Sequence, residues 1–203
     1  IMACAKHFPG HGDVAVDSHY DLPLIAKNRQ QLDSLELYPF TKLFAAGVGS
    51  VMIAHLAIPV IDNRPNRPTS LSQNNINNLL RDSLKYNGLT FTDALEMKGV
   101  AKFFPAGEAA VEALVAGNDM LCLPEDVPAA IDAVKTAVRK KRLKQSDVDD
   151  KVRKVLSAKW DLGLYNPQFV DTTNLLTDLN KNTDEFNRQV ARNTVTVLKN
   201  DAQ

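Results

Sequence analysis

The segment KHFPGHGDVAVDSH, from Lys6 to His19, contains three of the four histidines of this 203-residue chain, together with two aspartates. Side chains of this kind are costly to bury unless they are paired or hydrogen-bonded. Such a density of titratable groups has three interpretations: a solvated loop, a metal site or an acid–base centre. The residues along the rest of the chain help to choose among them.

A metal site could draw its ligands from this segment: His7, His11 and His19, with Asp13 or Asp17. Successive histidines are four and eight residues apart, which matches no compact metal-binding motif. Pro9 and Gly10 also disfavour the helix that would bring His7 and His11 onto one face. We therefore expect no metal here, and no sequence motif indicates another cofactor.

Four short apolar runs have the length and composition of strands that are buried on both faces: Ile1–Ala5, Gly49–His55, Leu89–Thr92 and Asp119–Leu123. Titratable residues follow each run in turn: Lys6 and the histidine segment, then His55, Asp62 and Arg64, then Asp93 and Glu96, and last Glu125 and Asp126. Functional groups of parallel α/β folds collect at the carboxyl ends of the strands. The pattern is typical of the mouth of a catalytic barrel.

Three of these residues could carry nucleophilic or acid–base chemistry. Asp93 leaves a buried strand at its end, where a carboxylate either caps a helix or attacks an electrophilic carbon. Asp17 and His19 are two residues apart, so in an extended segment their side chains share a face and the carboxylate could orient the imidazole. A solvated pair of loop residues fits the same spacing.

The other polar residues near the strand ends admit roles in binding or in structure. Lys6 and His7 stand at a strand end, where a lysine is suited to an oxygen-rich ligand. His11 and Asp13 lie in a glycine-rich turn and fit simple turn residues. His55 ends an apolar run, and a hydrogen-bonded structural histidine is at least as good an interpretation of it as a binding residue.

Helical periodicity fills the gaps between the apolar runs. The expected helices lie between Leu32 and Phe44, from Ser72 as N-cap to Gly88, over 107–116 before Gly117, over 127–139, and from Ser146 as N-cap to Trp160. This alternation predicts an α/β fold with a parallel sheet. A doubly wound sheet and a (β/α)8 TIM-type barrel both fit, but a complete barrel takes about 250 residues and eight units. If the fold is a barrel, this chain supplies about its last four βα units.

Residues 1–165 are thus expected to form the barrel portion, and residues 166–203 a tail or linker that leads to a further domain or packs beneath the barrel. The end of the tail, VARNTVTVLKNDAQ, contains a β-rich run. The start of the chain, IMACAKHFPG, is already inside an apolar run, which suggests a cut instead of a natural N-terminus. The compartment of the protein therefore stays open between the cytoplasm and an exported location.

The composition excludes several classes of protein. Twenty-four basic residues balance twenty-four acidic ones, so no net field favours nucleic acid or an anionic membrane. Apolar runs such as SVMIAHLAIPV are too short to span a bilayer. Cys4 and Cys122 are too few for a disulfide framework, and both are expected to be buried thiols within strands.

Five motifs, in this order along the chain, resemble those of glycoside hydrolase family 3: KHFPGHGDVAVDSH, SVMIAHLAIPVID, RPTSLS, GLTFTDALEMKGV and AGNDMLCLP. The resemblance is to its β-N-acetylhexosaminidase (β-N-acetylglucosaminidase) branch and covers about residues 1–165. KHFPGHG followed by DSH at this spacing is its most specific part. The family fold is a (β/α)8 barrel, so the resemblance implies that this chain looks like the C-terminal half of the catalytic barrel.

The resemblance also implies roles for single residues. Asp93 matches the catalytic nucleophile of the family, His19 matches the acid/base of this branch, and Asp17 matches the partner of that histidine. Lys6 and His7 match the pair that holds substrate hydroxyls. These matches imply a retaining glycoside hydrolase that releases terminal β-linked N-acetylglucosamine through a covalent glycosyl-enzyme intermediate.

The implied partners are a carbohydrate, such as an N-acetylglucosaminide derived from peptidoglycan or chitin, and the missing N-terminal half of the barrel. The chain departs from the family pattern at two places. Ala94 follows the nucleophile where many members have a second aspartate, and RKKRL lacks a glycine that members often carry in that surface turn. Two alternatives stay open: a family 3 barrel that acts on another β-glycoside, and a non-catalytic barrel half that serves as a binding module.

Overall fold

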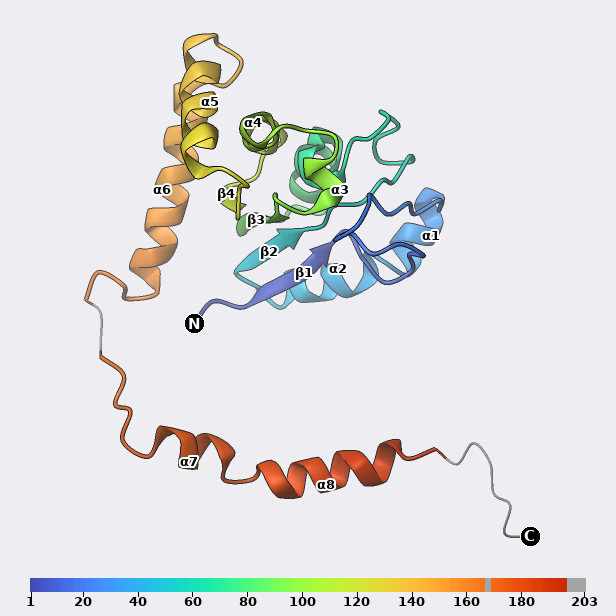
Figure 1. Ribbon diagram of the computed structural model, residues 1–203, viewed down its shortest axis with the longest axis vertical. Coiled ribbons are helices and arrows are strands. Elements are labelled where there is room, and N and C mark those ends of the chain that lie inside the picture. Colours follow the sequence, from blue (N-terminus) through green and yellow to red (C-terminus); the bar gives the residue numbers. More distant parts are fainter. Residues whose placement is uncertain (167–168, 197–203) are drawn as a thin grey trace. The chain divides into compact units, whose positions relative to one another are not determined.

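Four short parallel strands form the sheet that organises the first part of the chain (Figure 1). They are β1 (Cys4–Phe8), β2 (Ser50–Ile53), β3 (Leu89–Ala94) and β4 (Met120–Cys122), and they lie side by side in that order. The computed structural model describes residues 1–166 and 169–196. Helices connect each strand to the next, as parallel neighbours require. The predicted α/β fold with four βα units is therefore confirmed.

The connecting helices begin and end within two residues of the predicted positions in three cases out of five. They are α1 (Arg29–Ser34), α2 (Tyr38–Ala45), the 3₁₀ turn η1 (Thr69–Leu71), the wide π-type helix η2 (Asn74–Ser83), α3 (Lys98–Ala101), α4 (Ala106–Ala116), α5 (Val127–Arg139) and α6 (Gln145–Asp161). The three that match are α4, α5 and α6, and α4 ends at Gly117 as predicted.

Two helical segments and the start of α6 differ from the prediction for local reasons. The segment between Leu32 and Phe44 is two helices, because α1 starts at a capping box of Asn28 and Gln31 and Pro39 opens a new helix. Helix η2 ends at Ser83 and not at Gly88, although Ser72 Oγ does accept a hydrogen bond from the Asn75 amide at 3.3 Å. Helix α6 begins at Gln145, so Ser146 lies inside its first turn and the predicted cap is wrong.

Strand β1 lies further along the chain than predicted. The expected strand ended at Ala5, but the observed one runs from Cys4 to Phe8. Lys6 and His7 therefore belong to the strand itself and do not follow it. In the same way β3 extends to Ala94, so Asp93 is its next-to-last residue. His7 and Asp93 are each the next-to-last residue of their strand, whereas Asp17 and His19 lie in a turn beyond β1.

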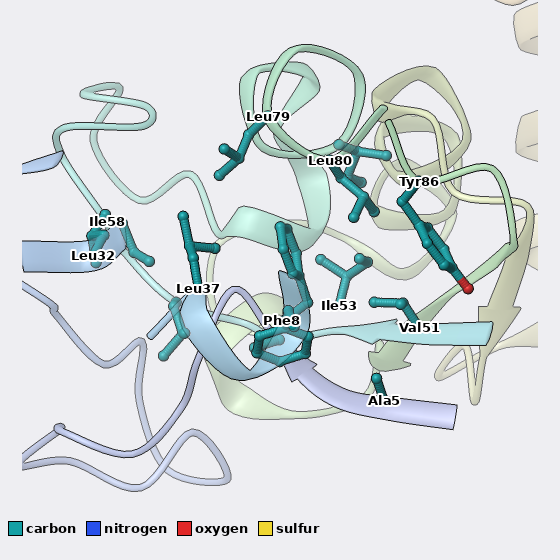
Figure 2. Packing of buried hydrophobic residues seen from close by; sticks show 14 of the residues in the cluster. Ala5, Phe8, Leu32, Leu37, Val51, Ile53, Ile58, Leu79, Leu80 and Tyr86 are labelled. Atoms are coloured by element: carbon teal, nitrogen blue, oxygen red, sulfur yellow. The ribbon is translucent and has the colours of Figure 1, made fainter. Parts of the chain in front are cut away.

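The main apolar core lies on the face of the sheet that the first helices cover (Figure 2). Ala5 pairs with Val51 in register, and Phe8, Ile53 and Leu80 pack in the same cluster with almost no exposed area. Each fully buried side chain of this size stabilises the fold by roughly 1.5–3 kcal/mol. This packing holds the carboxyl ends of β1 and β2 in place.

The opposite face of the sheet is only half covered. Met52, Phe91 and Met120 lie in one row across β2, β3 and β4 and are each partly exposed. Cys4 is exposed and Cys122 is half-buried, so the prediction that both thiols are buried is wrong. The prediction assumed strands that are covered on both faces. In the structure, alternate residues of these strands point to the face that is only half covered.

By its internal contacts the chain divides into two units, Ile1–Tyr165 and Asn166–Gln203. Within the described residues of the second unit lie α7 (Leu175–Asn180) and α8 (Thr183–Thr194). Of the stretch 190–203 that contains the β-rich run, residues 190–194 are helical, and residues 197–203 lie outside the described part of the chain. None of the helices in residues 1–166 and 169–196 is long and apolar enough to cross a membrane.

Candidate active site

Asp93 presents its carboxylate at the carboxyl end of β3. Its side chain is 17% exposed, and its Oδ2 lies 3.8 Å from Nε2 of His7 on β1. Its other oxygen, Oδ1, accepts a hydrogen bond from the backbone N–H of Ala94 at 2.9 Å. Asp93 does not cap a helix, because the next helix, α3, starts after Met97 and has no side-chain cap. The carboxylate is therefore fixed by its own strand and open on one side.

His7 is the predicted site residue that the structure brings next to Asp93. Burial lowers the pKa of His7, and the positive charge of Lys6 acts in the same direction, while the Asp93 carboxylate opposes them. The ring is thus mainly neutral near pH 7. A neutral imidazole can exchange hydrogen bonds with hydroxyl groups without neutralising the nearby carboxylate. Lys6 lies exposed one residue earlier on the same strand.

Asp17 and His19 form the predicted pair. Nδ1 of His19 lies 2.6 Å from Oδ1 of Asp17, and the same oxygen accepts a hydrogen bond from the His19 backbone N–H at 2.9 Å. These two hydrogen bonds lower the pKa of Asp17, which therefore stays anionic. The carboxylate fixes a proton on Nδ1 when the ring is neutral and leaves Nε2 free to exchange one. Both side chains are more than half exposed.

The pair is anchored through the residue between its members. Ser18 is buried; its carbonyl accepts a hydrogen bond from the Gly99 N–H at 3.2 Å, and its hydroxyl lies 3.1 Å from Nε2 of His11. His11 is thus more than the simple turn residue that the sequence suggested. Within the described residues, His19 makes no hydrogen bond or ion pair with Asp93. The site therefore consists of two pairs, His7 with Asp93 and Asp17 with His19, that do not touch.

An ion pair between Lys27 and the buried Glu36 holds the histidine segment, Lys6–His19, in place. Lys27 Nζ lies 2.7 Å from Oδ2 of Asp13 and also contacts Oε1 of Glu36, whose side chain is 4% exposed. A Cβ at Gly10 would meet Cβ of Glu36 at 2.6 Å, so only glycine lets the segment pass this closely. Asp13, which the sequence suggested to be a turn residue, therefore takes part in this support.

An open cavity of about 560 Å³ lies beside the same segment and is lined by Lys6, His7, His11 and Glu36, among others. Asp93 does not line it. Residues 1–166 and 169–196 contain no group of three or more His, Cys, Asp or Glu side chains placed to hold a metal ion. His7, His11 and His19, the predicted alternative ligands, instead face Asp93, Ser18 and Asp17 in turn.

Sequence reasoning did not identify several residues that position the site. Lys27, Glu36, Ser18 and Gly99 were not singled out. Glu36 did carry a signal, because a charged residue lies between Leu35 and Leu37 in an apolar stretch. His55 was left undecided between structure and binding; it is fully buried and hydrogen-bonded at both ring nitrogens, so it is structural in the resting molecule.

Comparison with known proteins points to one family. The model of the glycosyl hydrolase family 3 N terminal domain matches residues 1–158. Beta-hexosaminidase A from Pseudoalteromonas piscicida is 37% identical over 134 residues, and beta-hexosaminidase from Chromobacterium violaceum is 36% identical over 137 residues. These alignments cover 61% and 66% of this chain.

A solved structure agrees with these relatives. The glycoside hydrolase family 3 beta-N-acetylglucosaminidase from Paenibacillus sp. str. FPU-7 superposes with a TM-score of 0.80 at 40% identity and covers 84% of this chain. The chain spans only 33% of that protein, and 22% and 38% of the two curated relatives. The likeness therefore concerns one part of larger proteins.

Proposed function

Because this chain belongs to glycosyl hydrolase family 3, we propose that the protein is a retaining β-N-acetylhexosaminidase that releases terminal β-linked N-acetylglucosamine. The single observation that carries the proposal is the arrangement at the strand ends, with one open carboxylate at Asp93 and a separate, exposed Asp17–His19 pair. A retaining glycosidase needs these two parts: a nucleophile on one side of the sugar and a proton donor at the leaving oxygen.

The N-terminal domain of this family is a (β/α)8 TIM-type barrel, and the chain has four consecutive βα units of it. We propose that the rest of the barrel is contributed by protein outside this chain. The row of Met52, Phe91 and Met120 supports this, because apolar side chains on the inner face of a barrel are normally packed. Residues 1–165 would then be the second half of the catalytic domain, and 166–203 a tail or linker to a further domain.

In the first chemical step, an Asp93 oxygen attacks the anomeric carbon and forms a glycosyl ester while the glycosidic C–O bond breaks. His19, protonated at Nε2, gives that proton to the departing oxygen. The Asp17 carboxylate at 2.6 Å stabilises the imidazolium before transfer and keeps the useful tautomer after it. Imidazole is the side chain that most readily gives and takes a proton near neutral pH.

In the second step, neutral His19 takes a proton from water, and the water oxygen attacks the anomeric carbon. The ester bond to Asp93 breaks, which restores the carboxylate and releases the sugar. Lys6 and His7 would hold sugar hydroxyls during both steps, since both lie on β1 and His7 faces Asp93 across the end of the sheet. The exposure of His19 is consistent with a loop that approaches the sugar after it has bound.

The proposed substrate is an N-acetylglucosaminide, such as one derived from peptidoglycan or chitin. This choice rests on the relatives named beta-hexosaminidase and on the DSH sequence at Asp17–His19. The test is hydrolysis of p-nitrophenyl β-N-acetylglucosaminide and of the matching glucoside by the full-length protein. We expect the first to be preferred by at least tenfold, and Asp93→Asn to abolish turnover of both.

Glu96→Gln is the matched control, because Glu96 is an exposed carboxylate three residues from Asp93 and should retain activity. A preference for the glucoside would move the assignment to another β-glycosidase of the same family. A folded wild-type protein that hydrolyses neither compound would refute the enzyme and favour a binding module.

A further inference from the structure

His55 is a fully buried histidine with a hydrogen bond at each ring nitrogen. It lies two residues beyond β2 and is 0% exposed. Its Nδ1 lies 2.7 Å from the hydroxyl of Ser70, and its Nε2 lies 2.9 Å from the carbonyl oxygen of Ala94. No part of this side chain can reach a substrate.

The partners of His55 fix its protonation. A carbonyl oxygen only accepts hydrogen bonds, so Nε2 must carry the proton that is donated to Ala94. Burial holds the pKa of His55 below its usual value, so Nδ1 is unprotonated and accepts from the Ser70 hydroxyl. Ser70 is itself held, because its carbonyl accepts from the side-chain amide of Asn118 at 2.8 Å. The donor at Nε2 is therefore set by a buried chain of hydrogen bonds.

Ala94 joins His55 to Asp93. The carbonyl of Ala94 accepts from His55, while its N–H donates to Oδ1 of Asp93 at 2.9 Å. The orientation of this one residue thus determines where the Asp93 carboxylate points. Loss of the His55 donor would leave the Ala94 carbonyl with the Met97 N–H at 3.1 Å as its partner and weaken the hold on the end of β3.

His55 also lies close to Gly99, the residue that is hydrogen-bonded to Ser18 between Asp17 and His19. A Cβ added at Gly99 would lie 3.4 Å from Cβ of His55 and 3.2 Å from the carbonyl oxygen of Ser18. Gly99 donates its N–H to that carbonyl at 3.2 Å. Helix α3 therefore passes so close to His55 that a Cβ at Gly99 would touch it, and the same residue is hydrogen-bonded to the centre of the pair.

We propose that His55 is a positioning residue that sets the placement of Asp93 relative to His19, through Ala94 on one side and Gly99 on the other. The expected effect on kcat rests on the proposed function. The protonation of His55 and its hydrogen bonds to Ser70 and Ala94 do not depend on that function. Misplacing a reacting group by about 1 Å can cost roughly 100-fold in rate, even when binding is little changed.

The test compares His55→Gln with His55→Asn in the full-length protein. The amide of glutamine can place an N–H near the position of Nε2, whereas the shorter asparagine reaches only the position of Nδ1. We expect His55→Gln to keep kcat within about threefold of wild type and His55→Asn to lower it about 10- to 100-fold, with KM changed much less. Leu56→Ala is the control for general destabilisation, since Leu56 is the next residue and equally buried.

Equal kcat values for the glutamine and asparagine variants would overturn the proposal, as would a loss of kcat in Leu56→Ala of the same size at the same loss of thermal stability. A second readout does not depend on activity. In ¹⁵N-histidine spectra, the signal that disappears in His55→Gln should be that of a neutral ring protonated at Nε2 at pH 7. A charged ring or a proton on Nδ1 would refute the structural part even if the protein proved to have no glycosidase activity.

Discussion

Lys27 and Glu36 form an ion pair in which the lysine is 18% exposed and the carboxylate 4% exposed, and Lys27 also holds Asp13 of the histidine segment. Removal of the cation from such a pair leaves a buried negative charge uncompensated. We expect Lys27→Met to lower the free energy of unfolding of the catalytic domain by more than the loss of an exposed ion pair does, and to lower activity through the histidine segment.

Arg29→Met is the matched control. Arg29 pairs with Asp33 at 2.8 Å, but both side chains are about half exposed, so this change should cost under about 1 kcal/mol. Calorimetry of the full-length variants measures both effects. Equal decreases of the melting temperature in Lys27→Met and Arg29→Met would contradict the claim that the burial of Glu36 makes the loss of Lys27 more costly.

Lys141 is a strained residue in the RKKRL turn. It follows α5 with a φ of 59°, in the left-handed region that glycine tolerates best. The Arg142 N–H donates to Ala137 at 2.9 Å, as in a helix end that normally uses glycine at this point. We expect Lys141→Gly to stabilise the domain by about 0.5–1 kcal/mol. Lys140 has a φ of −83°, so Lys140→Gly should not increase the free energy of unfolding. An equal increase in both variants would contradict backbone strain at Lys141.

The ionisation of Asp62 makes the free energy of unfolding depend on pH in the acidic range. Burial raises its pKa, but hydrogen bonds from Arg64 and Ser72 outweigh this and lower the pKa to about 2. Because the folded pKa lies below the unfolded value of about 3.9, the contribution is complete above pH 4 and is lost as the pH falls towards 2. Since Arg64 is half exposed, the contribution is roughly 1–2 kcal/mol. In Asp62→Asn, unfolding free energy should fall less steeply across this window; an unchanged slope would contradict the assignment.

Chelation should leave the activity of the full-length enzyme unchanged. The three histidines of the Lys6–His19 segment face a carboxylate or a hydroxyl within the chain, and the proposed chemistry uses proton transfer alone. Treatment with EDTA followed by dialysis tests this expectation. Loss of activity that zinc restores would favour the metal interpretation of this segment.

The pairing of Asp17 with His19 could be predicted from their spacing, but the expected extended segment is a turn, in which the Asp17 carboxylate accepts from the His19 backbone N–H and faces its ring. The location of His7 and Asp93 at one edge of the sheet could be expected from the repeat of βα units, since parallel strands end at the same edge; their direct approach across β2 could not. Both predictions depend on local geometry or on the repeat of βα units.

Other features depend on contacts that no local pattern encodes. Lys27 reaches Glu36 across the start of α1, and Gly99 reaches Ser18 from a helix of four residues that the periodicity did not indicate. The exposure of Cys4 follows from which face of the sheet the helices cover. The role of His55 was undecided because its partners, Ser70 and Ala94, are 15 and 39 residues away.

Because Asp93 is proposed as the nucleophile and His19 as the proton donor, the effect of removing His19 should depend on the leaving group. An acidic phenol departs without a proton, so His19→Ala should spare the first step for such substrates and cripple the cleavage of natural glycosides. Without a base to activate water, the second step should then be slow, and the glycosyl ester should accumulate.

The most direct test is therefore a rapid quench of the full-length His19→Ala variant with an aryl N-acetylglucosaminide of an acidic phenol, followed by peptide mass spectrometry. We predict a burst of one phenol per enzyme, and one N-acetylhexosamine attached to the peptide that contains Asp93. A variant with no burst and equal losses on activated and natural substrates, or a sugar attached to a different residue, would contradict the assignment of these two residues.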